Sequence, residues 1–314
     1  MRSSPTSIAY WPTGPDYVKL PFLRCACVDI GSNTTRLLVA ELEHGVLREL
    51  AAVREFTLIG SAVDQEGVIP PAKIDETAEA VAAQVSTARR LGARLITIVG
   101  TAVLRTAPNT GELAEKIIDL TGFPLQILSE EAEAEMSFLG ATTLSELNGE
   151  GPVAVADVGG GSSELAVGKP RQRPDWWHSL EVGSGRLARS FLEDDPPTPE
   201  QLAACRLHAA EAIAGVAPPD VARALAVGGS ANSMRLLAGP RLDQEAIEKA
   251  LAVLTRTPAA DVAHDYEIDV RRVRLLPAGI TILAAVSDLL GMPLEVARGG
   301  LREGVVLRLA ATAQ

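Results

Sequence analysis

The order of apolar and polar positions predicts that the chain starts with strands and then changes to helix. Between residues 25 and 59, apolar runs are separated by turn residues, with one turn at residues 44–45. These runs predict three consecutive strands, the last spanning about residues 49–59. From residue 72 to 91 the apolar positions recur instead at spacings of three and four, which predicts a helix that stops at Gly92.

Strands and helices then alternate up to about residue 147. The expected strands lie at residues 95–99 and 125–128, with a helix ending at Leu120 between them and a second helix at about residues 130–147. The sequence Asn-Gly-Glu-Gly-Pro at residues 148–152 reads as a connection between domains.

The second half of the chain repeats this order. Its predicted strands lie at residues 153–157, 164–167, 177–182 and 224–227. The chain is predicted to be mostly helical from Asp243 onward, with a short strand near residues 294–297 and a last helix from about residue 300 to the end. The repeated order indicates two similar α/β domains.

A duplicated hairpin is the first feature of the sequence that indicates a function. Residues 29–36 read Asp-Ile-Gly-Ser-Asn-Thr-Thr-Arg and residues 157–164 read Asp-Val-Gly-Gly-Gly-Ser-Ser-Glu, each after an apolar strand and before another. Small turn residues let backbone N–H groups converge on a phosphate. The residues predicted to bind phosphate in these turns are Gly31, Ser32, Asn33, Thr34, Gly159, Gly160, Gly161 and Ser162.

The two copies differ at one telling position, where the first has Arg36 and the second Glu164. Arginine suits a phosphate oxygen, whereas glutamate suits a metal ion or water in its shell. Two solvent-exposed strand residues are the alternative, which is weaker for Glu164 and about equal for Arg36. The strand-end acids, Asp29 and Asp157, are placed to hold a Mg²⁺ ion that bridges phosphate oxygens.

Length and composition agree with a two-domain α/β protein. The 314 residues are too many for one small core, and 47% of them are hydrophobic while only 4% are aromatic. We expect a loose tail at residues 1–23 rather than a signal peptide, domains at 24–147 and 148–299, and a last helix at about 300–314 that can pack back on the first domain.

Charge and cysteine content narrow the possible partners. The net charge of −11 argues against a broad nucleic-acid-binding surface, so a polyanionic ligand would need a local basic cleft. No apolar run approaches the ~20 residues that a membrane span requires. Cys25, Cys27 and Cys205 form neither a disulfide framework nor a zinc pattern, which indicates buried thiols in a reducing cytoplasm.

Three further segments complete a recognisable set of motifs. They are Gly-Thr-Ala-Val-Leu-Arg-Thr-Ala-Pro-Asn at 100–109, Ser-Glu-Glu-Ala-Glu-Ala-Glu-Met-Ser-Phe-Leu-Gly at 129–140, and Gly-Gly-Leu-Arg-Glu-Gly at 299–304. Together with the two hairpins, they make the chain from Cys25 onward resemble the Ppx/GppA family of exopolyphosphatases and guanosine pentaphosphate phosphohydrolases, in its short two-domain form.

The acidic motif departs from the family pattern, which commonly reads Ser-Gly-x-Glu-Glu-Ala-Arg. Glu130 stands in place of the glycine and Glu135 in place of the arginine. Alignment on Phe-Leu-Gly puts Glu133 at the catalytic position, with Glu131 as its rival. The alternative for all of these acids is a favourable interaction with a helix N-terminus.

The resemblance implies an α/β fold of two actin-like ATPase (ribonuclease H-like) domains facing each other across a cleft. It also implies hydrolysis of a terminal phosphoanhydride bond, with Glu133 as the base or orienter for the attacking water. Arg36 and Arg302 would neutralise the transferring group. Arg105 would either bind phosphate or brace the loop after its strand, and Arg302 could alternatively pair with Glu303 on a solvated helix face.

The resemblance further implies a cofactor. Asp157 and Glu164, with Asp29 from the opposite hairpin, would hold Mg²⁺, with Mn²⁺ as an alternative.

The leading expectation is an exopolyphosphatase, and the nearest rival is a guanosine pentaphosphate 5′-phosphohydrolase that uses the same site. A small-molecule kinase and a non-catalytic sensor of polyphosphate or the alarmone remain open as other classes. The expected partners are the phosphate substrate and, from the frequency of closed dimers alone, a second copy of the chain, without nucleic acid or membrane.

Overall fold

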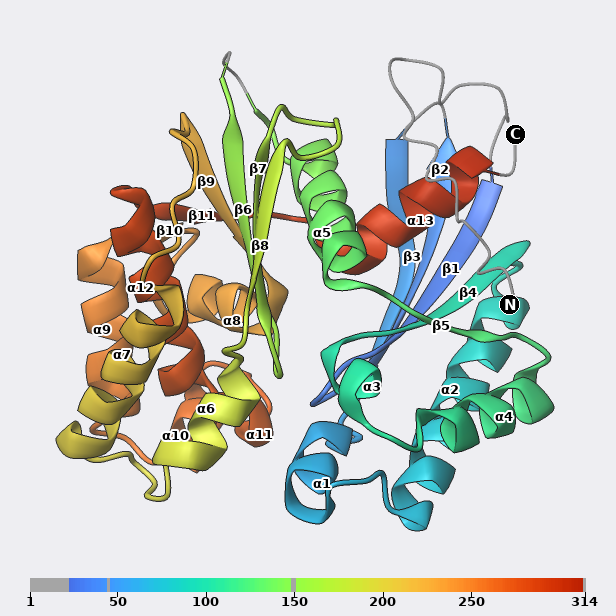
Figure 1. Cartoon of the computed structure of the whole chain (residues 1–314), viewed down its shortest axis with the longest axis horizontal. Helices are drawn as coiled ribbons and strands as arrows, with labels where there is room; N and C mark the ends of the chain where they lie inside the picture. The colour runs from blue at the N-terminus through green and yellow to red at the C-terminus, as the bar shows by residue number, and fades with distance from the viewer. Residues whose placement is uncertain (1–22, 44–45, 148–150, 313–314) are drawn as a thin grey trace, which may run out of the picture.

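The computed structural model describes residues 23–43, 46–147 and 151–312. The expected tail up to residue 22, the turn at residues 44–45 and residues 148–150 of the expected connection lie outside the described residues. Figure 1 shows two α/β halves side by side, each built on one twisted sheet.

The first sheet has the strand order β3-β2-β1-β4-β5. Its strands are β1 (Leu23–Ile30), β2 (Thr35–Glu43), β3 (Val46–Glu55), β4 (Leu95–Gly100) and β5 (Leu125–Ile127). The first three form an antiparallel meander, and β4 and β5 continue the sheet parallel to β1.

The second sheet repeats this arrangement, with the order β10-β11-β9-β6-β7-β8. Its strands are β6 (Val153–Val158), β7 (Ser163–Gly168), β8 (Trp176–Leu180), β9 (Arg223–Val227), β10 (Arg241–Leu242) and β11 (Leu294–Val296). Again the first three are antiparallel and the next two are parallel to the first. The structure confirms the predicted α/β fold of two actin-like domains.

Helices cover both sheets. The first half contributes α1 (Ile59–Glu66), α2 (Pro71–Arg90), α3 (Ala102–Thr106), α4 (Thr110–Thr121) and α5 (Glu130–Leu144). The second half contributes α6 (Ser184–Phe191), α7 (Pro199–Ile213), α8 (Gly228–Ala238), α9 (Gln244–Leu254), α10 (Ala259–Asp265), α11 (Val270–Val273) and α12 (Leu276–Leu290). The last helix, α13 (Leu301–Thr312), follows β11.

Two elements differ from the prediction around the first hairpin. The third strand ends at Glu55 instead of Ile59, and Ile59 begins the unpredicted helix α1. Leu58 adopts the left-handed conformation (φ 51°) and turns the chain there. Its N–H donates to the Asn33 carbonyl, and the Gly60 N–H donates to Ser32 at 2.7 Å. Contacts with the distant hairpin therefore decide this turn, and a local pattern cannot reveal them.

Two smaller differences concern the ends of elements. The helix expected to end at Leu120 is α4, and the short helix α3 before it was not predicted; the two are separate because Ala107 precedes Pro108 and takes an extended conformation. The two-residue strand β10 was not predicted, since so short a run has no measurable period.

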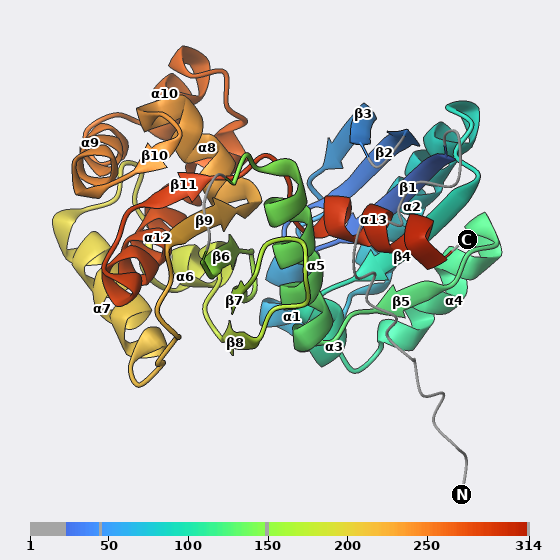
Figure 2. The same cartoon turned by 90° about the horizontal axis from the view of Figure 1, so that it is seen from above.

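The halves are joined by two crossing helices. Helix α13 packs on the first sheet, where Val306 and Leu307 join a core with Cys25 and Cys27 (Figure 2). Helix α5 packs on the second sheet, where Phe138 joins a core with β6 and β7. Helix α5 precedes the expected domain boundary at residues 147/148 but contacts the second sheet, and that division of the chain stays a prediction.

The helices α5 and α13 touch through their backbones. A Cβ on Gly140 would lie 2.0 Å from the Gly300 carbonyl oxygen, and a Cβ on Gly304 would lie 1.9 Å from that of Met136. Only glycine allows this approach, so these positions fix how closely the two halves meet.

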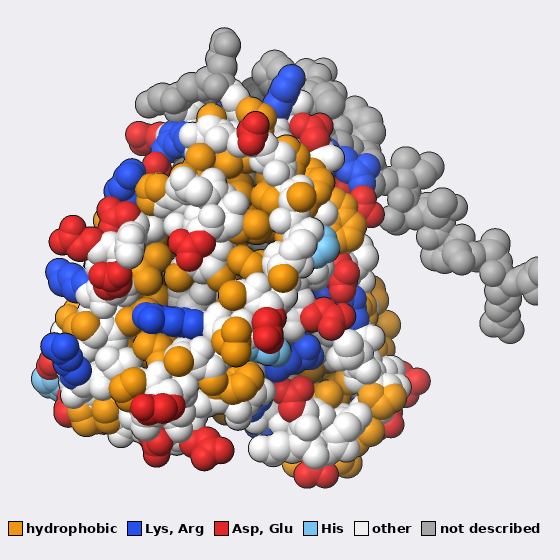
Figure 3. Space-filling view, turned by 60° about the vertical axis from the view of Figure 1, so that its left-hand side comes forward, with side chains coloured by type: hydrophobic (Ala, Val, Ile, Leu, Met, Phe, Trp, Pro, Cys, Tyr) orange, Lys and Arg blue, Asp and Glu red, His pale blue; other side chains and the backbone are white. Residues whose placement is uncertain are grey.

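On the face in Figure 3, acidic, basic and apolar side chains are interspersed. Within the described residues no helix has the length and apolar character needed to cross a membrane. All three cysteines are buried and unpaired, as their positions predicted.

Candidate active site

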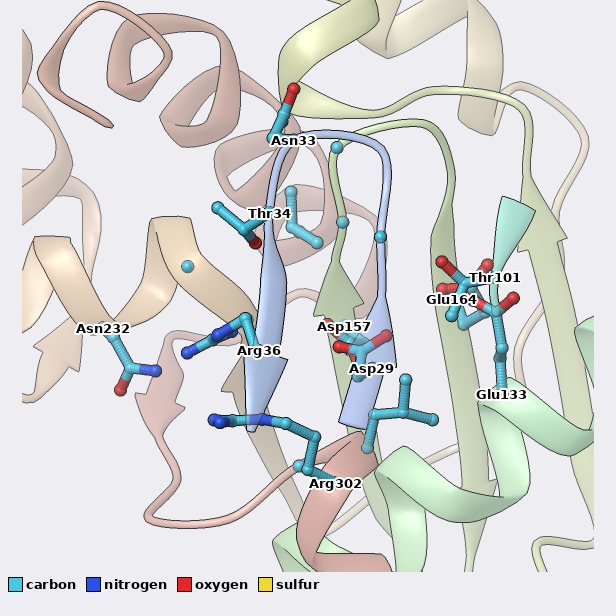
Figure 4. A pocket seen from close by; sticks show the side chains of 18 of the residues that line it. Asp29, Asn33, Thr34, Arg36, Thr101, Glu133, Asp157, Glu164, Asn232 and Arg302 are labelled. Atoms are coloured by element: carbon cyan, nitrogen blue, oxygen red, sulfur yellow. The ribbon is translucent and has the colours of Figure 1, made fainter. Parts of the chain in front are cut away.

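A cavity of about 340 Å³ lies between the two halves and is lined by both duplicated hairpins (Figure 4). All but one of the predicted site residues line it. They are Asp29, Gly31, Ser32, Asn33, Thr34, Arg36, Glu133, Asp157, Gly159, Gly160, Gly161, Ser162, Glu164 and Arg302. Segments more than a hundred residues apart in the sequence thus meet in one place.

The hairpin turns have the same backbone geometry. The Gly31 N–H donates to the Thr34 carbonyl at 3.0 Å, and the Gly159 N–H donates to that of Ser162 at 3.1 Å. Each turn therefore places its small residues at the cavity wall in the same way.

The two turns also approach each other closely. A Cβ on Gly160 would lie 2.4 Å from Asn33 Nδ2, and one on Gly161 would lie 2.6 Å from Ser32 Oγ. The two glycines are needed because the opposing hairpin fills the space that a side chain would occupy.

Strand register places the charged residues in rows. Asp29 on β1 lies opposite Arg36 on β2, which lies opposite Arg54 on β3. In the second sheet Asp157 lies opposite Glu164. Directly opposite residues in antiparallel strands point to the same face, so Asp29 and Arg36 line the cavity together, as do Asp157 and Glu164, whereas Arg54 is exposed beyond the lining residues.

Six carboxyl groups line the cavity, and burial raises the pKa of four of them, those of Asp29, Glu133, Asp157 and Glu164. Desolvation raises the pKa of Asp29 to about 6 against the opposing charges of Arg302 and Arg36. Desolvation likewise raises the pKa of Asp157, which accepts a hydrogen bond from Ser137 Oγ at 2.5 Å. The cluster concentrates acidic oxygens where a cation would stabilise their charged forms.

Glu133 and Glu164 form the most perturbed part of this cluster. Burial raises the pKa of Glu133 to about 8, although Arg105 opposes the shift. For Glu164 burial comes first and the neighbouring Glu133 and Asp157 charges add to it, which raises its pKa well above the usual range. Ser162 Oγ donates to Glu164 at 2.8 Å. A carboxyl with a raised pKa in a cleft is suited to accept a proton.

Helix α5 presents only one of its rival glutamates to the cavity. Ser129 caps the helix by accepting from the Ala132 N–H, and one turn later Glu133 points inward with 5% exposure. Glu131 is about half exposed and pairs with Arg173, outside the cavity. Buried Glu135 pairs with Arg173 and with Arg308 on α13. The geometry therefore favours Glu133 over Glu131.

Arg105 is the predicted site residue that does not line the cavity. Its Nη1 donates to the Leu128 carbonyl at 3.0 Å and to Glu133. The structure thus gives no support to direct phosphate binding by Arg105 and favours the alternative that it braces its surroundings, with Glu133 as the group that it holds.

The donor set suits a hard cation shared with a phosphate ligand. Among the described residues no three His, Cys, Asp or Glu side chains converge on one metal position. Asp29 Oδ1 is nevertheless buried without a hydrogen-bond partner. Mg²⁺ is commonly held by one or two carboxylates, waters and substrate phosphates, and the oxygens of Asp29, Asp157 and Glu164 fit such an ion.

Basic residues line the other end of the cavity, and some were missed by the sequence analysis. Arg36 and Arg302 were predicted, whereas Arg272 and Arg298 were not. Arg272 is 6% exposed and its guanidinium lies so close to Gly229 that a Cβ there would be 2.6 Å from Cζ. The only local signal was the Arg-Arg-Val-Arg run at residues 271–274, which reads as a solvated helix face.

Two uncharged polar residues were also missed, namely Thr101 after β4 and Asn232 on α8, and so were the acids Glu49 on β3 and Glu303 on α13. Gly228 and Gly229 line the cavity and begin α8 directly after β9. The positive φ of Gly228 (92°) fits a tight turn there.

Comparison with known sequences identifies the same family as the motifs do. The Ppx/GppA phosphatase family matches residues 38–313. Exopolyphosphatase 1 of Mycobacterium tuberculosis is 29% identical over 307 residues, which cover 91% of this chain and 88% of that protein. The guanosine-5′-triphosphate,3′-diphosphate pyrophosphatase of Vibrio vulnificus is 26% identical over 299 residues, 90% of this chain and 59% of that enzyme.

An uncharacterised protein of Streptomyces coelicolor is 38% identical over 186 residues, 59% of this chain. The match spans 55% of that relative's length.

Solved structures agree. A Ppx/GppA family member from Aquifex aeolicus superimposes with a TM-score of 0.79 at 25% identity, covering 94% of this chain and 99% of that one. An exopolyphosphatase from Cytophaga hutchinsonii has the same fold, with a TM-score of 0.79 at 18% identity over 92% of this chain and 98% of that one.

Proposed function

Since the chain belongs to the Ppx/GppA phosphatase family, whose members hydrolyse phosphoanhydride bonds, we propose that it removes the terminal phosphate of inorganic polyphosphate. The observation that carries the proposal is the cavity itself. It joins two phosphate hairpins, a buried Glu133 and several arginines in a protein whose net charge is −11. A local basic cleft is what an acidic protein needs to bind a polyanion.

The reaction needs a positioned water and stabilised charge more than covalent help. Glu133 accepts the proton of the attacking water, and Arg105 holds that carboxylate in place. The N–H groups of the two turns bind the oxygens of the terminal phosphate. Closure of the hairpins on each other excludes bulk water from that phosphate.

We also propose that Asp157, Glu164 and Asp29 hold a Mg²⁺ ion, with Mn²⁺ able to replace it. When bound, the ion would polarise the phosphate oxygens and offset their negative charge. The unpartnered Oδ1 of Asp29 supports this proposal.

Guanosine pentaphosphate is the second candidate substrate, and the Vibrio vulnificus relative supports it. The described residues that line the cavity include no aromatic side chain, and their few apolar members are small or aliphatic. A guanine base would find no aromatic stacking partner among these residues, so the cavity favours polyphosphate.

Phosphate release by the purified protein with Mg²⁺ tests the proposal on long-chain polyphosphate and, separately, on guanosine pentaphosphate. We expect release mainly from polyphosphate, and Glu133→Gln should lower the rate about 10²–10⁴-fold because it removes the proton acceptor. Glu131→Gln is the matched control, since this residue lies outside the cavity on the same helix turn. Equal losses in both variants would sink the assignment of Glu133.

Two further proposals concern the oligomeric state and the location of the protein. We propose a homodimer from the prevalence of closed dimers, and a cytoplasmic location from the three buried free thiols. Light scattering of the purified protein checks the dimer, and a monomeric mass would refute it.

A further inference from the structure

The charges of the cavity are separated along its length. In Figure 4, Glu133 and Glu164 lie on one side of the two hairpin aspartates, and Arg36 and Arg302 lie on the other side. The cavity therefore has an acidic end, a middle between the hairpins and a basic end.

The duplication explains this separation. Arg36 and Glu164 are equivalent positions, each directly opposite the strand-end aspartate of its own hairpin. Because the hairpins face each other, the row that starts at Asp29 and the row that starts at Asp157 run in opposite directions from the middle (Figure 4). Arginine in one copy and glutamate in the other thus give the two ends opposite charge.

The basic end extends beyond the two predicted arginines. Arg36, Arg54, Arg272 and Arg302, here called the arginine cluster, come from β2, β3, α11 and α13 and therefore from both halves. Arg54 lies directly opposite Arg36 across the strand pair, and Glu49 and Ala52 of the same strand line the cavity.

The acids next to the arginine cluster include Asp29, opposite Arg36, and Glu303, which pairs with Arg302 at 4.0 Å, and they leave two guanidinium nitrogens of the cluster without a partner. Arg36 Nε and Arg272 Nε are buried without a hydrogen-bond partner. Burial, followed by the charges of Arg302 and Arg54, lowers the pKa of Arg36 to about 9, and burial followed by Arg54 lowers the pKa of Arg272 to about 10. Like charges directly opposite in a sheet are unfavourable unless an anion lies between them.

We propose that the arginine cluster binds the leaving part of a condensed phosphate, so that the chain lies along the cavity with its terminal phosphate beside Glu133. This inference rests on the proposed function. It replaces the sequence-based expectation that Arg36 and Arg302 neutralise the transferring group, because both lie on the far side of the hairpin aspartates from Glu133.

With the chain bound in this direction, every atom and proton of the hydrolysis is accounted for. The water oxygen forms a bond to the terminal phosphorus, and its proton passes to the Glu133 carboxylate. The bond from that phosphorus to the bridging oxygen breaks, and the bridging oxygen keeps the electron pair. It becomes a terminal oxygen of a chain one phosphate shorter, and its new negative charge lies at the arginine cluster. Orthophosphate leaves from the hairpin end, and Glu133 then returns its proton to solvent.

Chain-length dependence separates the two roles. A residue that binds distant phosphates of the leaving chain favours long substrates, whereas a residue on the transferring group affects all lengths alike. Phosphate release is measured on pyrophosphate, tripolyphosphate and long-chain polyphosphate for the unchanged protein and for Arg54→Gln. Arg94→Gln is the matched control, because Arg94 is exposed at the opposite end of the first sheet, before β4.

We expect Arg54→Gln to lower the ratio of kcat/KM on tripolyphosphate to that on pyrophosphate about tenfold, the value of one charged hydrogen bond, while Arg94→Gln leaves the ratio unchanged. An unchanged ratio in active Arg54→Gln would overturn the proposal. If the unchanged protein releases no phosphate from any of these substrates, the proposed function fails. The rise in Tm on adding tripolyphosphate then tests the arginine cluster. If the cluster binds phosphate, this rise is smaller for Arg54→Gln than for Arg94→Gln. An equal rise in both variants rejects the proposal.

Discussion

Glu133 is 5% exposed, and burial raises the pKa of its carboxyl to about 8. The ordinary pKa of 4.5 applies to the unfolded chain, so between these values the folded protein holds a proton that the unfolded protein has lost. Stability therefore falls as pH rises from about 4.5 to 8. The same shift brings the pKa of this base close to neutral pH, where proton transfer is efficient.

At the residue scale we expect Glu133→Gln to be more stable than the unchanged protein in metal-free buffer. The gain should reach roughly 2–8 °C in Tm above pH 8 and shrink toward pH 5, because the amide never ionises. Thermal denaturation with EDTA at several pH values measures this. A variant that is less stable at pH 8, or a gain independent of pH, would contradict the raised pKa.

Helices α5 and α13 show how elements set the geometry of the cavity. Helix α5 carries Glu133 into the cavity and, one turn later, lets Ser137 donate to Asp157. Helix α13 carries Arg302 in its first turn, at the basic end. Their crossing at Gly140 and Gly304 thus holds residues of both ends at fixed positions.

At the element scale we expect Gly304→Ala to destabilise the protein by about 1–3 kcal/mol, since its Cβ would overlap the Met136 carbonyl. Gly111→Ala on α4 is the control, because a Cβ there meets nothing within 4 Å. It should stabilise by about 0.5–1 kcal/mol through helix propensity. Urea denaturation of both variants distinguishes them, and equal effects would reject a close crossing.

Across the whole molecule, the halves also touch away from the crossing helices. Arg189 on α6 forms an ion pair with Asp64 on α1, and Arg271 lies over the Phe56 ring with Cζ 4.1 Å from its centroid. Figure 1 shows α1 and α6 at the opposite end of the molecule from α13. These contacts hold the two hairpins together from the side that α5 and α13 do not reach.

At the scale of the molecule we expect Asp64→Arg to raise KM for polyphosphate several-fold, because a repulsive pair opposes closure of the halves. The exchanged pair, Asp64→Arg with Arg189→Asp, should restore it. Steady-state kinetics at low and high salt measure both effects, and salt should weaken them since the pair is partly exposed. Failure of the exchange to restore KM would show that the contact does not control closure.

The sequence by itself determined the two hairpins and the two-sheet α/β fold, and all but one of the residues that it predicted for the site line the cavity. Hairpin turns and strand periods are local, so the spacing of Asp29 and Arg36, or of Asp157 and Glu164, already specifies which residues share a face. The repeat of this pattern was enough to place both turns at one cavity.

Only the tertiary structure decided the rest. It selected Glu133 among three nearby glutamates, because helix rotation and the Arg173 pairs direct the other two elsewhere. It also gathered Arg272 with Arg36 and separated the acidic from the basic end of the cavity. Which charged side chains lie close together depends on how the two halves pack. That packing is set by contacts between distant residues, such as Gly140 against Gly300, and the local pattern of apolar positions does not predict them.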